Sequence, residues 1–151
     1  MRHLWRGAGI APVLLKEAVE VTTTIGQLMT RDLVTIHPDE TMARARRLMK
    51  THGVQSLPVV EPPGLPVGLL TVRDLAMSVE TGERLEVKHV MRRSTKRVRP
   101  SMLLSEAAHL MAKDGTHHLL VTEKGRLLGV FSVFDMIQLV TLKENAKGAA
   151  G

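Results

Sequence analysis

The chain has 151 residues, of which 44% are hydrophobic and 24% are charged, a balance typical of a folded globular protein. It contains no cysteine, which excludes disulfide bonds, a thiolate nucleophile and cysteine-ligated zinc. Its net charge of +6 favours anionic partners such as nucleotides, nucleic acid or acidic proteins.

The amino-terminal residues 1–24 form an extension in which we expect a helix from Val13 to Val21. The apolar run Ile10–Leu15 is shorter than the roughly 18 to 20 residues that a membrane span needs. Charged Lys16 and Glu17 follow this run, where a secretory signal would have a small-residue cleavage site. We therefore expect a cytoplasmic protein without a membrane segment.

From about Ile25 to Val140 the chain repeats itself, with equivalent residues first 62 and then 61 positions apart. The matching pairs include Met29 and Met91, Pro38 and Pro100, Ala45 and Ala107, Leu48 and Leu110, Met49 and Met111, Gly53 and Gly115, and Gly68 and Gly129. A unit of this size buries too little surface to be stable alone. We therefore expect a first repeat at 25–82 and a second at 83–142, packed sheet against sheet about a pseudo-twofold axis, and a flexible tail at 143–151.

Each repeat begins with a predicted strand and a helix. The strand Leu33–Ile36 leads to a Pro-Asp turn, where we expect Asp39 to cap the helix and Ser101 to take its place in the second repeat. Glycines at 53 and 115 should end the two helices. An apolar stripe at i, i+3, i+4 and i+7 is predicted on the first helix, formed by Ala45, Leu48, Met49 and His52.

A hairpin and a second helix complete each repeat. The predicted hairpins pair Leu57–Val60 with Val67–Leu70, and Leu119–Val121 with Leu127–Phe131, because turn residues separate the β-rich runs. The second helices start near Asp74 and Asp135. We expect them to bury Leu75, Ala76 and Val79 in the first repeat, and Met136, Ile137 and Val140 in the second.

These second helices begin with a hydroxyl residue and an aspartate three positions later, Thr71 with Asp74 and Ser132 with Asp135. A carboxylate can accept hydrogen bonds from two vicinal ribose hydroxyls. A helix amino terminus also presents N–H groups and positive partial charge that suit phosphate. The same pattern is a capping box, in which the acid bonds back to the N–H of the cap residue. The pattern therefore indicates nucleotide binding, helix capping or both.

The segments Gly53–Val60 and Gly68–Asp74, with the matching Gly129–Asp135, resemble the motifs of a tandem pair of CBS domains, called a Bateman module. The similarity covers more than three quarters of the chain. It implies an α+β fold of two β-α-β-β-α CBS repeats. It also implies a regulatory ligand, an adenosine nucleotide such as AMP, ADP or ATP, in the cleft between the repeats.

The resemblance further implies two quasi-equivalent sites, each joining the turn of one repeat to the first strand and post-glycine segment of the other. In the family the acid holds the ribose, the hydroxyl lies near the phosphate, and the facing backbone reads adenine. In the first site Thr71, Arg73 and Asp74 would face Val98, Thr116, His117 and His118. In the second site Ser132 and Asp135 would face Thr35, Val54, Gln55 and Ser56.

Charge distinguishes the two sites. Arg73 lies in the first turn of its helix, where a cation opposes the helix dipole and is more stable beside an anion. Phe134 stands at the equivalent place in the second repeat. Together with Arg97, Arg99, His117 and His118, Arg73 makes the first site the more cationic. We therefore expect this site to prefer the more highly phosphorylated nucleotides.

Other functions have less support. His117 and His118 are adjacent on a strand and point to opposite faces, so we expect no metal site. The basic groups within 44–50 and 92–99 could contact nucleic acid, but the chain lacks aromatic platforms for stacking bases. No nucleophile motif or acid-base pair is present, so we expect no enzyme and no catalytic residue.

The sequence therefore predicts a regulatory module that binds an adenine nucleotide. Ligand occupancy would change how the two repeats, or two chains, sit together. The family suggests a homodimer, and a partner protein is expected because no segment reads as an effector domain. Two alternatives remain: a structural interaction module that binds no ligand, and a protein that binds nucleic acid through its basic groups.

Overall fold

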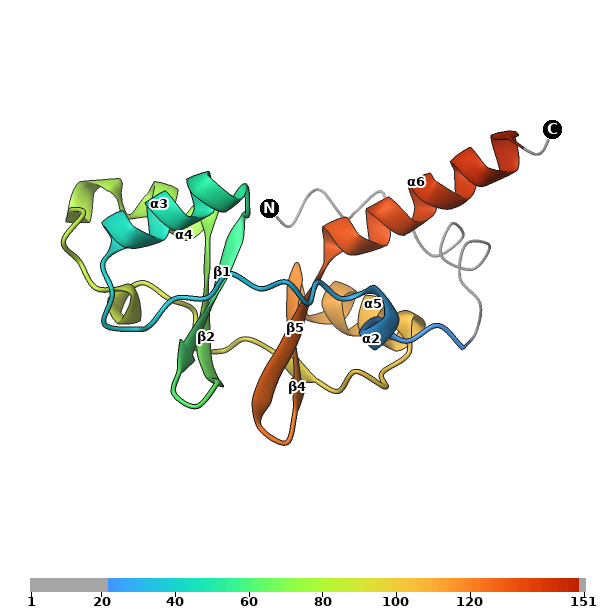
Figure 1. Cartoon of the computed structure of the whole chain (residues 1–151), viewed down its shortest axis with the longest axis horizontal. Helices are drawn as coiled ribbons and strands as arrows, with labels where there is room; N and C mark the ends of the chain where they lie inside the picture. Colours follow the sequence, from blue (N-terminus) through green and yellow to red (C-terminus); the bar gives the residue numbers. More distant parts are fainter. Residues whose placement is uncertain (1–21, 150–151) are drawn as a thin grey trace.

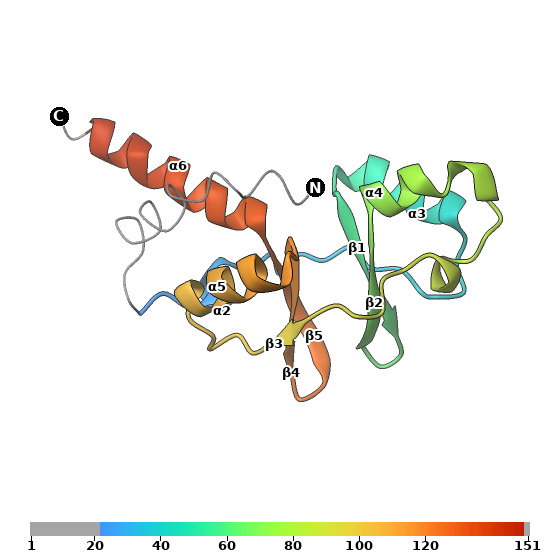
Figure 2. The same cartoon turned by 180° about the vertical axis from the view of Figure 1, so that it is seen from behind.

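The computed structural model describes residues 22–149, so the helix expected at Val13–Val21 lies outside the described residues. Two halves stand side by side, with their β-strands near the middle and their main helices on the outside (Figures 1 and 2). Within the described range no helix is long and apolar enough to cross a membrane.

The first half follows the predicted order of elements. Its hairpin has strands in antiparallel register, with Ser56 opposite Thr71. The predicted strand Leu33–Ile36 is reduced to one parallel bridge between Ile36 and Val59. The elements of this half are α3 (Met42–His52), β1 (Ser56–Glu61), β2 (Leu65–Thr71), α4 (Val72–Met77), and the 3₁₀ turns η1 (Val79–Thr81) and η2 (Val87–His89). Helix α2 (Ile25–Leu28) precedes them in the chain but lies in the other half (Figures 1 and 2).

The second half repeats this arrangement with a three-stranded sheet. A short first strand runs parallel to β4, and β4 pairs antiparallel with β5 so that His118 lies opposite Ser132. The elements are β3 (Arg97–Val98), α5 (Leu104–Asp114), β4 (His118–Glu123), β5 (Arg126–Ser132) and α6 (Val133–Ala149). The two halves confirm the predicted α+β fold of two β-α-β-β-α repeats.

A small apolar layer joins the two sheets. Leu69 of β2, Leu120 of β4 and Val130 of β5 are almost fully buried and form one cluster, with Leu33 and Leu127 packed at its edge. Since apolar side chains on strands of both repeats meet here, the repeats pack sheet to sheet as the sequence predicts.

Each repeat also completes the core of the other with its own amino-terminal residues. Ile25 and Met29 are buried in the core of the second repeat, while Val87 and Met91 are buried in the core of the first. The methionines cross the hairpins at Gly129 and Gly68, where a Cβ atom would lie 2.6 and 2.8 Å from the respective sulfur atoms. Glycine is therefore required where each exchanged segment crosses the facing hairpin.

The helix caps differ in part from the prediction. Gly53 and Gly115 end α3 and α5 with φ of 64°, as expected of C-cap glycines. At the other end, the cap of α3 is Thr41, whose hydroxyl accepts from the Arg44 backbone N–H at 3.2 Å. The prediction for Asp39 was wrong because the turn after Pro38 continues for two more residues.

The second repeat shows the same shift. Helix α5 has Leu103 as its N-cap residue, and the carboxylate of Glu106 accepts from the Leu103 backbone N–H at 3.0 Å. Ser101 lies in the turn before this cap, so its predicted capping role was wrong as well. In both repeats the N-cap is therefore the third residue after the proline, Thr41 after Pro38 and Leu103 after Pro100.

The second helix of each repeat buries fewer residues than predicted. Leu75 and Met136 are buried, but Ala76 is exposed, and Val79 and Ile137 are 63% and 53% exposed. One reason is that α4 ends at Met77, so Val79 falls in a separate 3₁₀ turn. His52 on α3 is also exposed rather than part of the apolar stripe.

Helix α6 continues to Ala149, through residues that the sequence analysis assigns to a flexible tail. Residues 143–147 contain Lys, Glu and Ala, which favour helix, and the first glycine after Gly129 is Gly148. Helix propensity therefore extends the element past the end of the repeat pattern.

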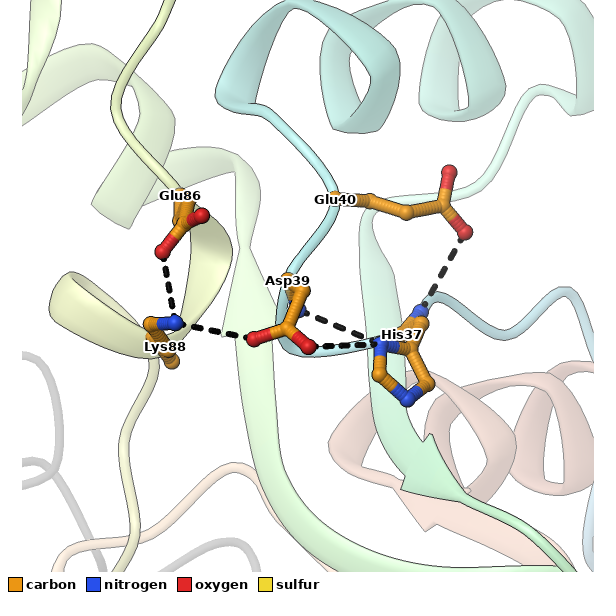
Figure 3. A network of polar contacts seen from close by, with 5 residues as sticks. All are labelled: His37, Asp39, Glu40, Glu86 and Lys88. Atoms are coloured by element: carbon orange, nitrogen blue, oxygen red, sulfur yellow. Dashed lines mark hydrogen bonds and ion pairs between the residues drawn. The ribbon is translucent and has the colours of Figure 1, made fainter.

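A polar network ties the inter-repeat segment to the first repeat (Figure 3). The Lys88 ammonium donates to Asp39 at 2.9 Å and lies 2.7 Å from a carboxylate oxygen of Glu86. These bonds raise the pKa of Lys88, and the Lys88 bond lowers the pKa of Asp39. Backbone bonds from Val87 to Glu40 and from Lys88 to Pro38 run alongside. The network thus holds the segment that carries Val87 into the first core.

Candidate functional site

The two aspartates at the starts of α4 and α6 both cap their helices. Asp74 Oδ2 accepts from the Thr71 backbone N–H at 2.9 Å and from the Thr71 hydroxyl at 2.8 Å. Asp135 Oδ2 accepts from the Ser132 backbone N–H at 2.6 Å and from its hydroxyl at 3.1 Å. Capping therefore engages Oδ2 in each case, and Oδ1 is the oxygen through which each carboxylate could hold a ligand.

The Oδ1 atoms meet two different side chains. Asp74 Oδ1 accepts from Arg92 Nε at 3.1 Å, whereas Asp135 Oδ1 accepts from the Thr30 hydroxyl at 3.4 Å. Thr30 and Arg92 are equivalent residues, 62 positions apart, and each follows one of the methionines that cross a hairpin. Neither residue is predicted as a site residue from the sequence, although the repeat register makes them equivalent.

The post-glycine segments lie beside the turn of their own repeat. Val72 donates its backbone N–H to the Gln55 carbonyl at 2.9 Å, and Val133 donates to the His117 carbonyl at 3.0 Å. Ser56 is paired with Thr71 in the hairpin. The resemblance assigns Gln55 and Ser56 to the opposite site. In the structure they instead lie beside Thr71, at the start of α4 in their own repeat, because β1 and β2 are neighbouring strands.

One electrostatic interaction across the repeats involves two residues of the expected first site, His118 and Asp74. His118, at the start of β4, is partly buried, and burial is the main cause that lowers its pKa to about 4. The charges of His117 and Arg92 lower this pKa further, and Asp74 opposes them. His118 of the second repeat therefore lies within electrostatic reach of the carboxylate at the start of α4.

The other predicted site residues differ in how far their side chains are available to a ligand. The Val98 side chain is buried in the second core, so only its backbone could line a site. The Thr116 hydroxyl donates to the His118 carbonyl at 3.0 Å, and Val54 packs at the edge of the first core. Thr35 and Arg73 are exposed. Among residues 22–149 no cluster of three or more metal-ligating side chains occurs.

Arg97, which the sequence analysis adds to the cations of the first site, points elsewhere. Its guanidinium donates to the Pro66 carbonyl at 2.7 Å, near the start of β2. Thr71 is at the other end of that strand. Arg92 rather than Arg97 is therefore the arginine that reaches the first carboxylate.

Comparison with known proteins gives a family and a common fold. The family model for the CBS domain matches residues 25–80 and 87–142. The CBS domain-containing protein YhcV of Bacillus subtilis is 31% identical over 130 residues, which cover 84% of this chain and 92% of YhcV.

Solved structures show the same architecture. CBSX2 in complex with AMP is 24% identical and has a TM-score of 0.69, with 80% of this chain and 98% of CBSX2 covered. The CBS domain pair of protein MJ0100 in complex with 5′-methylthioadenosine and S-adenosyl-L-methionine is 20% identical, with a TM-score of 0.74 and coverage of 81% and 98%. The chain belongs to the CBS-domain family and carries two CBS domains in tandem, as in a Bateman module.

Proposed function

We propose that this protein is a regulatory module that binds an adenosine nucleotide, AMP, ADP or ATP, between its two CBS repeats. The observation that carries the proposal is the geometry at Asp135. Its Oδ2 caps α6, while its Oδ1 makes one long contact of 3.4 Å with the Thr30 hydroxyl. A carboxylate oxygen has lone pairs for more than one donor, so Oδ1 can accept from a ribose hydroxyl.

The compounds bound by two proteins of the same fold support an adenosine ligand. CBSX2 was solved with AMP, and the MJ0100 pair with 5′-methylthioadenosine and S-adenosyl-L-methionine. These compounds share the adenosine group and differ in what the 5′ position carries. We infer that adenosine is the common requirement and that the residues around each aspartate select the rest of the ligand.

We expect Asp135→Ala to weaken nucleotide binding at its site roughly 10- to 100-fold, because a lost hydrogen bond to a charged group costs about 1.5–3 kcal/mol. Titration calorimetry with AMP, ADP and ATP measures this change. Asp135 also caps a helix, so the control must remove a cap without touching the site. Glu106→Ala does so, because Glu106 has the same capping role at α5.

Three results would contradict the proposal. Equal loss of affinity in Glu106→Ala and Asp135→Ala would leave only a capping role for the aspartate. No heat and no thermal shift with AMP, ADP, ATP, NAD or S-adenosylmethionine would favour a structural interaction module. Binding to duplex or single-stranded nucleic acid that falls steeply with salt would instead favour the basic groups as the functional surface.

We further propose that the module has no catalytic activity and works in the cytoplasm. Both aspartates cap helices, and they lie at the starts of different helices. Such an arrangement supports binding rather than paired acid-base chemistry. Its effect would be exerted on its own assembly or on a partner protein through the difference in ligand affinity between two states.

We also propose a homodimer formed through the second helices of the two repeats. Large apolar side chains are exposed on both, a feature typical of an interaction surface. In α4 and η1 these are Val72 (47% exposed), Met77 (75%) and Val79 (63%), and in α6 they are Phe134 (56%) and Ile137 (53%). The same structural position of both repeats thus contributes to one proposed interface.

The double variant Met77→Glu, Ile137→Glu is expected to shift the protein from dimer to monomer, because each carboxylate would have to be desolvated in the interface. We expect the dimer dissociation constant to rise at least tenfold, measured by analytical ultracentrifugation. Ala112→Glu, on an exposed position of α5, is the matched control and should leave the dimer intact. A monomeric wild type, or a dimeric double variant, would contradict the proposed interface.

A further inference from the structure

The two sites have the same backbone but different side chains at one decisive position. Thr30 exchanges backbone hydrogen bonds with Val130 at 2.9 and 3.1 Å. Arg92 exchanges the equivalent bonds with Leu69 at 2.9 and 3.0 Å. Both side chains therefore leave the chain from equivalent backbone positions beside an aspartate. In the second site that side chain is a neutral hydroxyl, and in the first it is a guanidinium.

This difference decides whether the aspartate can accept a ligand. Asp74 is only 9% exposed, and both of its oxygens are engaged, Oδ2 by Thr71 and Oδ1 by Arg92. A bond between a guanidinium and a carboxylate is charge-assisted and stronger than one from a neutral hydroxyl. The 3.4 Å contact from Thr30 to Asp135 is longer, and its donor carries no charge. A ribose hydroxyl therefore meets much stronger competition at Asp74 than at Asp135.

Arg92 can also leave the carboxylate, because its side chain is 54% exposed. A guanidinium can bind the oxygens of a phosphate in the same forked geometry with which it binds those of a carboxylate. A ligand with several phosphate charges can thus attract Arg92 away from Asp74, whereas an uncharged nucleoside cannot.

We propose that Arg92 is a specificity residue that makes the two sites unequal. It closes the Asp74 site to uncharged adenosine ligands and admits those whose phosphates take over its guanidinium. The Asp135 site, with Thr30 in the equivalent place, accepts adenosine without this requirement. The inference rests on the proposed function, because it assumes that the aspartates bind an adenosine group.

Calorimetric stoichiometry with adenosine and with ATP tests this assignment. The wild type is expected to bind one adenosine per chain, removed by Asp135→Ala and retained in Asp74→Ala, and to bind two ATP per chain. Arg92→Thr, which copies the second site, should bind two adenosines per chain. It should also bind ATP at the first site at least tenfold more weakly than the wild type, since that site loses the guanidinium that binds the phosphates.

The neighbouring Arg93 provides the control. Its guanidinium donates to the Lys88 carbonyl at 3.3 Å, so Arg93→Thr removes an exposed arginine without touching Asp74. This variant should keep the wild-type stoichiometry for both ligands. Circular dichroism checks that Arg92→Thr is folded, and Arg92→Gln, which keeps the side-chain length, serves as a second variant.

The outcomes separate this inference from the proposed function. Two adenosines per wild-type chain, or one per chain in both Arg92 variants, would overturn the role of Arg92 and leave nucleotide binding intact. Failure of the wild type and of both variants to bind any adenosine compound would overturn the proposed function, and the role of Arg92 with it.

Discussion

Replacing Phe131 with alanine is expected to lower the free energy of unfolding by about 3–5 kcal/mol. Phe131 is fully buried in the second core, where it packs with Leu119 and Met136 among other apolar residues. Truncation removes its transfer free energy and leaves a cavity that neighbours on two strands and a helix can fill only in part. Since domains of this kind are stable by about 5–15 kcal/mol, the loss is a large share of the total.

Urea titrations followed by circular dichroism measure this loss. Phe134→Ala is the matched control, because it removes the same side chain from a position that is 56% exposed. Both substitutions should be made in the Met77→Glu, Ile137→Glu background, so that dimer formation does not contribute. The control is expected to change the free energy by less than about 0.5 kcal/mol. An equal cost at both positions would contradict the burial of Phe131.

The second large effect concerns pH. The pKa of His118 is lowered from 6.5 to about 4, first by burial and then by the charges of His117 and Arg92. The unfolded chain therefore binds a proton in a pH range where the folded protein keeps His118 neutral. The contribution of neutral His118 to stability is complete above pH 6.5 and is lost as the pH falls toward 4. The loss should be on the order of 1–3 kcal/mol.

Carboxylates titrate over part of the same range, so the informative quantity is the difference between variants. His118→Ser, which inserts the side chain of its repeat counterpart Ser56, should abolish this component of the pH dependence. His52→Ser, at an exposed position of α3, should retain it. Free energies of unfolding measured between pH 4 and 7 distinguish the two. An unchanged slope in His118→Ser would mean that His118 is not buried in its neutral form.

The parts of the fold that depend on local sequence could be predicted. The hairpins are encoded by short β-rich runs and turn residues, and the helix ends at Gly53 and Gly115 by the need for a left-handed residue. The start of α3 was missed, because turn length and the contacts of residues 83–88 with the first repeat decide whether Asp39 or Thr41 becomes the cap. Such contacts arise only after distant segments have packed.

The candidate site divides in the same way. Pattern alone predicted that Asp74 and Asp135 cap their helices, because a hydroxyl residue followed by an aspartate before an apolar helix is a local signal. Arg92 was missed because it lies 18 residues from Asp74 and reaches it only through the crossing of Met91 over the first hairpin. Arg97 was wrongly included for the converse reason: its charge is visible in the sequence, but its direction depends on packing against Pro66.

The exchange of Met29 and Met91 between the cores means that the two repeats are not independent folding units. A chain divided at residue 82 would take Val87 and Met91 away from the half that needs them, although the division falls between the repeats of the sequence. Neither half can reach its final packing until the segment that it receives, residues 25–29 or residues 87–91, has docked. Any change that loosens residues 87–92 therefore removes the packing of Val87 and Met91 from the first core. It also removes the hydrogen bond from Arg92 to Asp74.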